Sequence, residues 1–496
     1  MIKIKKLVSS TIAALGFATV FFTSGCSVSD FKDTDVNPNA VEVPLTSALL
    51  TNASIRMGTI ANNQDLRSTA IWFPGQYTQY FSSTQYTDES LYSAVEPSWA
   101  EVYAGPLKDL QVIIDINTAP ETKDKALLSG SNEDQIAVAR ILKVYFFSHV
   151  TDMWGDIPYT DALQGEKQKL QPKYDSQQEV YKDLFKELKE ATAQIKDGDI
   201  HLKGDILYGG DMSKWKKFAN SLRLILALRI SKADATLGAA EAKSAIASGV
   251  IQDNADNAVL HYPGGTFKNP WYNEYDGRKD LAISDVIEKV LKDLSDPRTT
   301  VFGDPSAPGN IIGVPYGLER NGAISFTNSN PKWSRILAAS YRKEDSPYDI
   351  LTAADVYLAR AEAAKRGWTT EVALTMYNNG IKASFQGWGV FDQTTYAAYI
   401  ANPKVLLAGD ATDLTKIATQ RWLTFYPRGD QGWAEWRRTG IPALKPTPQA
   451  LNSSKQIPRR YIYPTNEANL NGDSYKAAAA LINGGDTADG RVWWDK

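Results

Sequence analysis

The chain has 496 residues, of which 43% are hydrophobic and 22% charged, so it can bury a large core and is not expected to be disordered. Lys and Arg total 54 against 57 Asp and Glu, which gives a formal net charge of -3 and argues against the basic surface that nucleic-acid binding needs. The single cysteine, Cys26, excludes an intramolecular disulfide and a zinc site built from cysteines.

The N-terminal segment has the features of a secretory signal peptide. Three lysines within the first six residues precede an apolar stretch over 7–22, which is shorter than the roughly 20 residues that a membrane-spanning helix needs. Ser24 and Gly25 then precede Cys26, and this pattern resembles a lipobox, although Thr23 stands where leucine is usual. At a lipobox the cysteine thiol is lipidated and the preceding peptide is removed, so we expect lipidation of Cys26.

These features predict three parts along the chain: a lipoprotein signal peptide over 1–25, a lipid-anchored tether over 26–43 and a single domain over 44–496. Cleavage would remove three lysines and no acid, which changes the formal charge from -3 to -6. The lipid, with palmitate among its acyl chains, would be the only membrane contact. The acidic residues of the tether resemble the sorting signal of surface-exposed lipoproteins, and a merely soluble linker is the alternative.

Helical periodicity dominates the predicted domain. Apolar residues fall on one face of a 3.6-residue repeat over 180–195 and over 215–226. The stretch 136–150 is apolar nearly all round, which predicts a central, fully buried helix. Alternating apolar and polar runs are few and short, so we predict a mainly α fold.

An alanine-rich stretch over 353–366 predicts a helix that Gly367 closes, and Thr370 can cap a second helix to about residue 384. This pair is similar to a tetratricopeptide unit, in which small side chains let two helices pack closely. The segments 261–280 and 302–335 are rich in Gly, Pro, Asn and Tyr and predict long loops, which are usually functional in a compact domain.

The sequence offers few candidates for catalysis. It contains no Gly-x-Ser-x-Gly elbow, His-Glu-x-x-His pair or phosphate-binding loop. His149, His201 and His261 are far apart in the sequence, and His149 is expected to be a hydrogen-bonded core residue. The acidic stretches near 469–473 and 486–490 are interpreted as turns and not as calcium loops. We predict no catalytic residue, metal or cofactor, although a glycosidase would need only two carboxylates.

Aromatic residues beside amides and charges are the best candidates for ligand binding, because flat rings stack on sugar faces and anchor peptides. The stretch 269–278 places such residues together with no helical or strand period, and two further aromatic residues lie in the next loop-rich stretch. The predicted ligand-binding residues are Trp271, Tyr272, Asn273, Tyr275, Arg278, Tyr316 and Trp333.

A second dense group of aromatic residues lies over 72–92. Trp72, Gln76 and Tyr80 recur at helical spacing, which favours a place in the core for this group. Trp99, in a helix-like run, is also assigned to the core.

Several motifs in the same order resemble the SusD/RagB family, particularly its SusD-like branch, over nearly the whole mature chain. The most specific is a helix that ends in a Trp-Gly-Asp-hydrophobic-Pro-Tyr turn. The motifs are Asp35–Asn39, Ala139–Tyr159, Asp296–Arg298, Tyr357–Glu362, Arg421–Trp422, Trp433–Gly440 and Pro458–Pro464 followed by Glu467 and Asn471. Taken one at a time, Arg437 and Arg438 are more typical of ion-pair partners than of ligands.

The resemblance implies a helical scaffold with tetratricopeptide-like helix pairs and a loop-rich half with few short strands. It further implies a surface-exposed outer-membrane lipoprotein that captures glycan and delivers it to a SusC-type TonB-dependent transporter. Two alternatives remain open: a surface glycoside hydrolase, and a peptide-binding member of the same family. A periplasmic helical-repeat scaffold that binds only proteins is a further rival.

Overall fold

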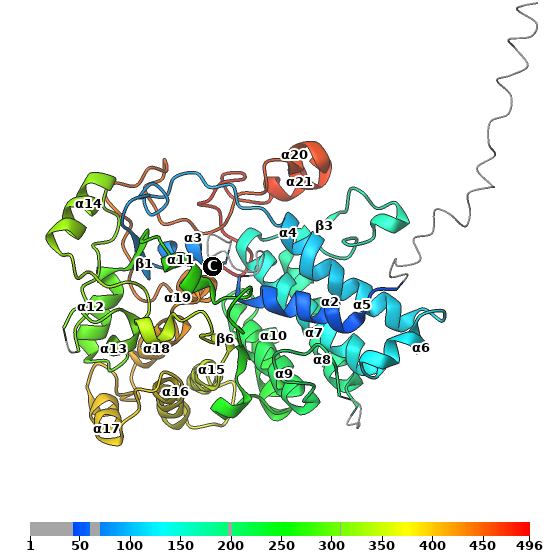
Figure 1. The fold of residues 1–496 in the computed structure, drawn as a ribbon, viewed down its shortest axis with the longest axis horizontal. Coiled ribbons are helices and arrows are strands. Elements are labelled where there is room, and N and C mark those ends of the chain that lie inside the picture. The colour runs from blue at the N-terminus through cyan, green and yellow to red at the C-terminus, as the bar shows by residue number, and fades with distance from the viewer. Residues whose placement is uncertain (1–42, 60–69, 197–200, 308) are drawn as a thin grey trace, which may run out of the picture. The chain divides into compact units, whose positions relative to one another are not determined.

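The computed structural model describes residues 43–59, 70–196, 201–307 and 309–496, and its helices dominate the chain (Figure 1). Residues 45–496 form one unit by their contacts. The α-helices are α2 Thr46–Ile55, α3 Trp72–Tyr77, α4 Ala100–Val102, α5 Lys108–Thr118, α6 Lys123–Ala126, α7 Asn132–Trp154, α8 Gln177–Gln194, α9 Met212–Arg229, α10 Ala235–Ala247, α11 Pro270–Tyr275, α12 Asp285–Leu294, α13 Thr299–Phe302, α14 Arg320–Ser329, α15 Ala353–Lys365, α16 Ala373–Gly387, α17 Gln393–Ala401, α18 Asp413–Phe425, α19 Gly429–Thr439, α20 Glu467–Leu470 and α21 Gly472–Ala480. The mainly α prediction is confirmed.

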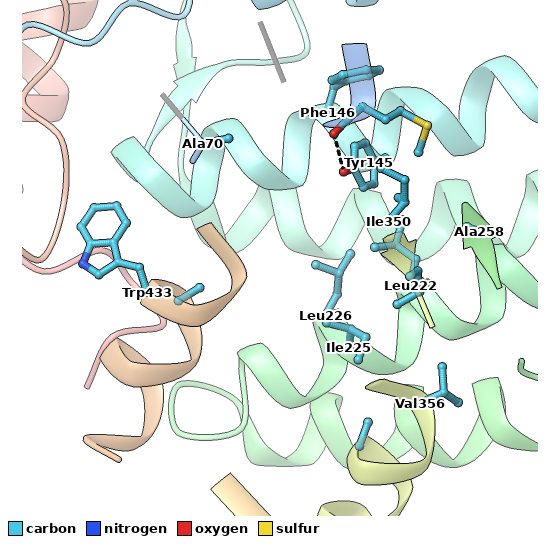
Figure 2. Packing of buried hydrophobic residues seen from close by; sticks show 14 of the residues in the cluster. Ala70, Tyr145, Phe146, Leu222, Ile225, Leu226, Ala258, Ile350, Val356 and Trp433 are labelled. Carbon is cyan, nitrogen blue, oxygen red and sulfur yellow. Dashed lines mark hydrogen bonds between the residues drawn. The ribbon is translucent and has the colours of Figure 1, made fainter. Parts of the chain in front are cut away.

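Helix α7 is the central, buried helix that the sequence predicts. It begins where the Ser131 hydroxyl accepts a hydrogen bond from the backbone N–H of Asp134, a typical N-cap. It packs against α5 and α8, and nearly every residue from Ala137 to Trp154 is buried. Figure 2 shows Tyr145 of this helix in a core shared with side chains of α9, β6 and α15. The Tyr145 hydroxyl donates a hydrogen bond to the backbone oxygen of Met57 over 3.0 Å.

Helices α15 and α16 form the predicted tetratricopeptide-like pair, and they pack closely together. Gly380 explains the close approach, because a Cβ there would lie 2.7 Å from Cγ of Leu358. Gly367 closes the first helix with φ +75°, as predicted. The predicted cap of the second helix is wrong: α16 begins three residues after Thr370, with Val372 at the cap position and no side-chain hydrogen bond.

The strands are short and form three antiparallel pairs. Strand β2 Ile157–Pro158 pairs with β3 Tyr174–Asp175, and β4 Ala258–Leu260 pairs with β6 Tyr348–Leu351. Strand β1 Phe81–Ser83 pairs with β5 Leu281–Ile283 in the register Phe81 to Ile283. Strand β1 lies within the aromatic group over 72–92, and β5 follows the aromatic stretch over 269–278. The β1–β5 pair therefore brings these two parts of the sequence side by side.

Buried ion pairs join three helices in the C-terminal half. Arg438 of α19 holds Glu362 of α15 through two hydrogen bonds of 2.6 and 2.7 Å, and it also contacts Glu435 over 2.6 Å. Arg421 of α18 donates to both oxygens of the same Glu435 carboxylate, over 3.0 and 3.1 Å. This four-residue set, named here the Arg438 network, confirms the ion-pair interpretation of Arg438. Arg437 differs, because its guanidinium stacks 3.8 Å from the ring centre of Trp433 and donates to backbone carbonyl groups.

Within the part of the chain that the structure describes, none of the helices has both the length and the apolar character needed to cross a bilayer. Cys26, the signal peptide and most of the tether lie outside the described residues.

Candidate ligand-binding cleft

Tyr86 carries the most accessible aromatic ring of the described residues. Its exposed fraction is 51%, whereas the other described Trp, Tyr and Phe side chains are buried or half-buried. A ring must be accessible to stack on a flat ligand face. Exposure therefore directs the search for a binding site to Tyr86.

The β1–β5 pair holds the segment before Tyr86 against the segment before β5. The backbone N–H of Thr84 donates to the carbonyl oxygen of Asp280 over 2.9 Å, and the Thr84 hydroxyl donates to the carbonyl of Lys279 over 2.5 Å. Arg278, on the second segment, lies with its guanidinium 5.8 Å from the centre of the Tyr86 ring. A hydrogen bond of 2.7 Å and an ion-pair contact of 2.5 Å join this guanidinium to the Asp280 carboxylate, and they raise the pKa of Arg278.

A tight turn follows Tyr86 and forms one wall. The backbone N–H of Ser93 donates to the carbonyl oxygen of Asp88 over 2.9 Å. The backbone N–H of Leu91 donates to the carbonyl oxygen of Thr87 over 3.1 Å. The Glu89 carboxylate accepts a hydrogen bond from the indole N–H of the buried Trp72 in α3. The wall is thus fixed to the helical core and is not a free loop.

Tyr86 and this turn line an open cleft of about 470 Å³, named here the Tyr86 cleft. Its volume lies within the range of small-ligand sites, and its walls mix apolar, hydroxyl and charged groups. The lining residues are Phe73, Gln85, Tyr86, Thr87, Asp88, Glu89, Ser93, Ala94, Val95, Glu96 and Arg320.

Trp271, the first of the sequence-predicted ligand residues, is buried in the core with an exposed fraction of 1%. Its ring packs edge to face on Phe81, with ring centres 5.4 Å apart. The stretch that shows no period in the sequence is the short helix α11. The Asn269 side chain caps it by accepting from the backbone N–H of Trp271, and Pro270 occupies the first helical position. The Trp271 ring lines a small cavity of about 90 Å³ together with Tyr341 and Trp388. This volume is below that of ordinary small-ligand sites.

The other predicted ligand residues in and near α11 differ from Trp271 in their burial and contacts. Tyr272 is half-buried beneath the Lys268 ammonium, 4.9 Å from the ring centre, and Asn273 is also half-buried. The Tyr275 hydroxyl donates to the carbonyl of Leu281 over 2.9 Å, and burial raises the pKa of Tyr275. Arg278 alone among the predicted residues contacts the Tyr86 ring.

Tyr316 and Trp333 are half-buried and do not line the Tyr86 cleft. Tyr316 is tied to α12 by its backbone N–H, which donates to the carboxylate of Asp285 over 2.9 Å. The pKa of the Tyr316 hydroxyl is raised, chiefly by burial. These contacts give Tyr316 a structural environment in this structure.

The core assignment of the 72–92 group is correct for Trp72, Gln76 and Tyr80, which are buried, and Trp99 is buried too. It misses Tyr86, which lies outside their helical spacing and directly before the turn residues Thr-Asp-Glu-Ser. That change from helical spacing to turn chemistry is the signal that could have identified Tyr86. Nothing comparable in the sequence indicates Arg320, which comes from α14.

His149 is a core residue, as predicted. Its Nε2 lies 2.9 Å from the Asp430 carboxylate and its Nδ1 lies 2.7 Å from the carbonyl oxygen of Tyr145. Hydrogen bonding to His149 helps to hold the pKa of Asp430 below its usual value, against the opposing effect of burial. Neither residue lines the Tyr86 cleft. Among the described residues, no group of three or more His, Cys, Asp or Glu side chains is placed to hold a metal ion.

A family model matches residues 38–464 of the chain; it is SusD-like and carries the description "Starch-binding associating with outer membrane". None of the curated proteins matches the sequence at a significant level.

Solved structures match over 91% of the chain. One is described as a chitin-binding protein, with 27% identity, a TM-score of 0.76 and 100% of that chain covered. A chitin-binding SusD homologue from Flavobacterium johnsoniae has 25% identity and a TM-score of 0.75, with 98% of its chain covered. A SusD homologue from Bacteroides fragilis has 21% identity and a TM-score of 0.78 over 100% of its chain, which shows likeness of fold.

Proposed function

This chain belongs to the SusD-like family of starch-binding proteins that associate with the outer membrane, and from that membership we propose that it is a nutrient-binding lipoprotein of the cell surface. In this proposal the lipid on Cys26 anchors the protein. The folded domain captures glycan and passes it to a SusC-type TonB-dependent transporter. The protein itself catalyses no reaction.

We place the ligand at the Tyr86 cleft, and the observation that carries this choice is the exposure of the Tyr86 ring. A tyrosine face can stack on a sugar ring, and hydroxyl and charged side chains beside it can bind sugar hydroxyl groups. The Arg278 guanidinium lies 5.8 Å from the centre of the ring, so the Tyr86 side chain is partly ordered before ligand binds. Trp271 is left out of the proposed site because its ring is buried.

Oligomers of N-acetylglucosamine are the first ligand to test. Two of the similar structures, at 27% and 25% identity, are described as chitin-binding, and both match 91% of this chain. Starch oligosaccharides are the second, because the family description names starch. Peptides form the third panel, since a peptide-binding member is the alternative within the family.

Replacing Tyr86 by alanine is expected to weaken binding of N-acetylglucosamine oligomers by about tenfold, the effect of losing one stacking ring of about 1.4 kcal/mol. The Tyr86→Phe variant keeps the ring and should bind nearly as well as the natural protein. Isothermal titration of the protein without residues 1–26 measures both.

Tyr272→Ala is the matched control, because it removes a half-buried tyrosine ring outside the cleft. Loss of affinity in Tyr272→Ala with no change in Tyr86→Ala would move the site to α11. Products of glycan cleavage, sought in the same mixtures, would contradict the non-catalytic role and direct attention to the carboxylates of Asp88, Glu89 and Glu96.

Cys26→Ser is expected to release the protein from the membrane fraction of cells, because the lipid on this residue is proposed as the only anchor. Fractionation followed by immunoblotting measures the released share, and protease treatment of intact cells measures surface exposure. A variant that stays in the membrane fraction with its signal peptide removed would contradict the anchor. Ser24→Ala, which keeps a small residue before the cysteine, is the control.

A further inference from the structure

Acidic side chains outnumber basic side chains in the lining of the Tyr86 cleft. Asp88, Glu89 and Glu96 supply three carboxylates to its lining, and Arg320 supplies one guanidinium. Arg278 lies at the Tyr86 ring but is not a lining residue, and its charge is paired with Asp280. The lining is therefore formally negative.

Two of these carboxylates are available to a ligand. Asp88 and Glu96 are exposed, and neither forms a salt bridge with a residue that the structure describes. Glu89 is different, since it accepts the Trp72 indole hydrogen bond and serves the wall of the cleft.

Polar groups in the same turn add a second, independent feature. Thr87 lines the cleft and its exposed fraction is only 2%, yet its hydroxyl has no hydrogen-bond partner among the described residues. Buried hydroxyl groups usually have a partner, so an unpaired one in a residue that lines the cleft favours a polar ligand over an apolar one.

We infer that the Tyr86 cleft selects glycans by charge, favouring sugars that carry free amino groups and disfavouring sugars that carry carboxylate or sulfate groups. This inference rests on the proposed glycan-binding function, and it specifies which class of glycan the cleft prefers. Asp88 and Glu96 attract a protonated amino group, and they repel a uronate, whose charge Arg320 can compensate only in part. Neutral N-acetylglucosamine units fall between these classes.

The test compares three oligomers of equal length: glucosamine, N-acetylglucosamine and galacturonate. All three oligomers are titrated at the same pH, about 5.5, and at low salt concentration. We expect the glucosamine oligomer to bind roughly fivefold more tightly than the N-acetylated one at low salt, the size expected from exposed charge pairs. Raising the salt concentration should remove this advantage, and galacturonate should bind most weakly.

The double variant Asp88→Asn with Glu96→Gln should lose the preference for glucosamine, so that the ratio of its affinities for the glucosamine and N-acetylglucosamine oligomers falls to about one. The double variant Glu121→Gln with Asp124→Asn is the matched control, because it makes the same charge change at exposed residues outside the cleft. It should bind all three oligomers as the natural protein does.

Equal affinity of the natural protein for all three oligomers, or an equal loss in both double variants, would overturn charge selection and leave glycan binding intact. Failure to bind any of them or starch oligosaccharides would instead contradict the proposed function. Binding of the neutral oligomer to the natural protein distinguishes these two failures, because it is expected whether or not the cleft selects by charge.

Discussion

Replacing Arg438 by methionine is expected to lower the free energy of unfolding by about 3 to 5 kcal/mol. Arg438 is buried and binds both carboxylate oxygens of Glu362 and one of Glu435. Without it, two buried carboxylates share the remaining arginine contacts. Loss of one partner of a buried ion pair is costly because the other charge stays out of water. Urea denaturation followed by circular dichroism measures the change.

Arg366→Met is the control for this prediction. Arg366 contacts the same Glu362 over 2.8 Å, but a quarter of its side chain is exposed. Its loss should therefore cost less than about 1 kcal/mol. Similar losses in the two variants would show that burial does not set the cost. If Arg438→Met fails to fold, Arg438→Lys keeps the charge and allows the same comparison, since it loses only the paired geometry.

Trp271→Ala is expected to lower the free energy of unfolding by about 3 to 5 kcal/mol and to leave glycan affinity nearly unchanged. The ring is buried, packs on Phe81 and makes no hydrogen bond through its indole nitrogen to a described residue. The change therefore removes packing and leaves a cavity. Denaturation measures stability, and titration at 15 °C measures the affinity of the folded protein.

Tyr272→Ala tests the same helix at a half-buried ring, and its loss of stability should be clearly smaller. A stable Trp271→Ala variant that no longer binds glycan would contradict the structural role and support the sequence-based site. Trp271→Phe, which fills part of the space, should recover a share of the lost stability.

The long helices could be predicted from the sequence because burial leaves a periodic pattern. The stretch 136–150 is one example, because a segment that is apolar nearly all round forms the centre of α7. The start of α16 could not be placed from Thr370, since packing against α15 sets where the helix begins. A hydroxyl residue is a possible cap and not an obligatory one.

The binding site was harder to predict than the fold. Trp271 and Tyr86 are both aromatic residues beside charged and polar neighbours, so composition cannot separate them. Their exposures differ because Asn269 and Pro270 start a short helix that turns Trp271 inward, whereas Tyr86 follows the last paired residues of β1. The sequence predicts Arg278 as a ligand-binding residue within the 269–278 group. The structure places its guanidinium near the Tyr86 ring, and the β1–β5 pairing brings these two residues together.

That pairing also determines when Arg278 reaches the Tyr86 ring during folding. The hydrogen bond from Thr84 to Lys279 joins residues 195 positions apart in the sequence, so the two side chains meet only through a contact of high contact order. A fragment that lacks either segment cannot place Arg278 beside Tyr86. Ligand affinity is consequently a property of the globally folded chain. By mass action, a glycan present at 100 times its dissociation constant would raise the free energy of unfolding by about 2.7 kcal/mol, and the protein would resist unfolding most when its ligand is abundant.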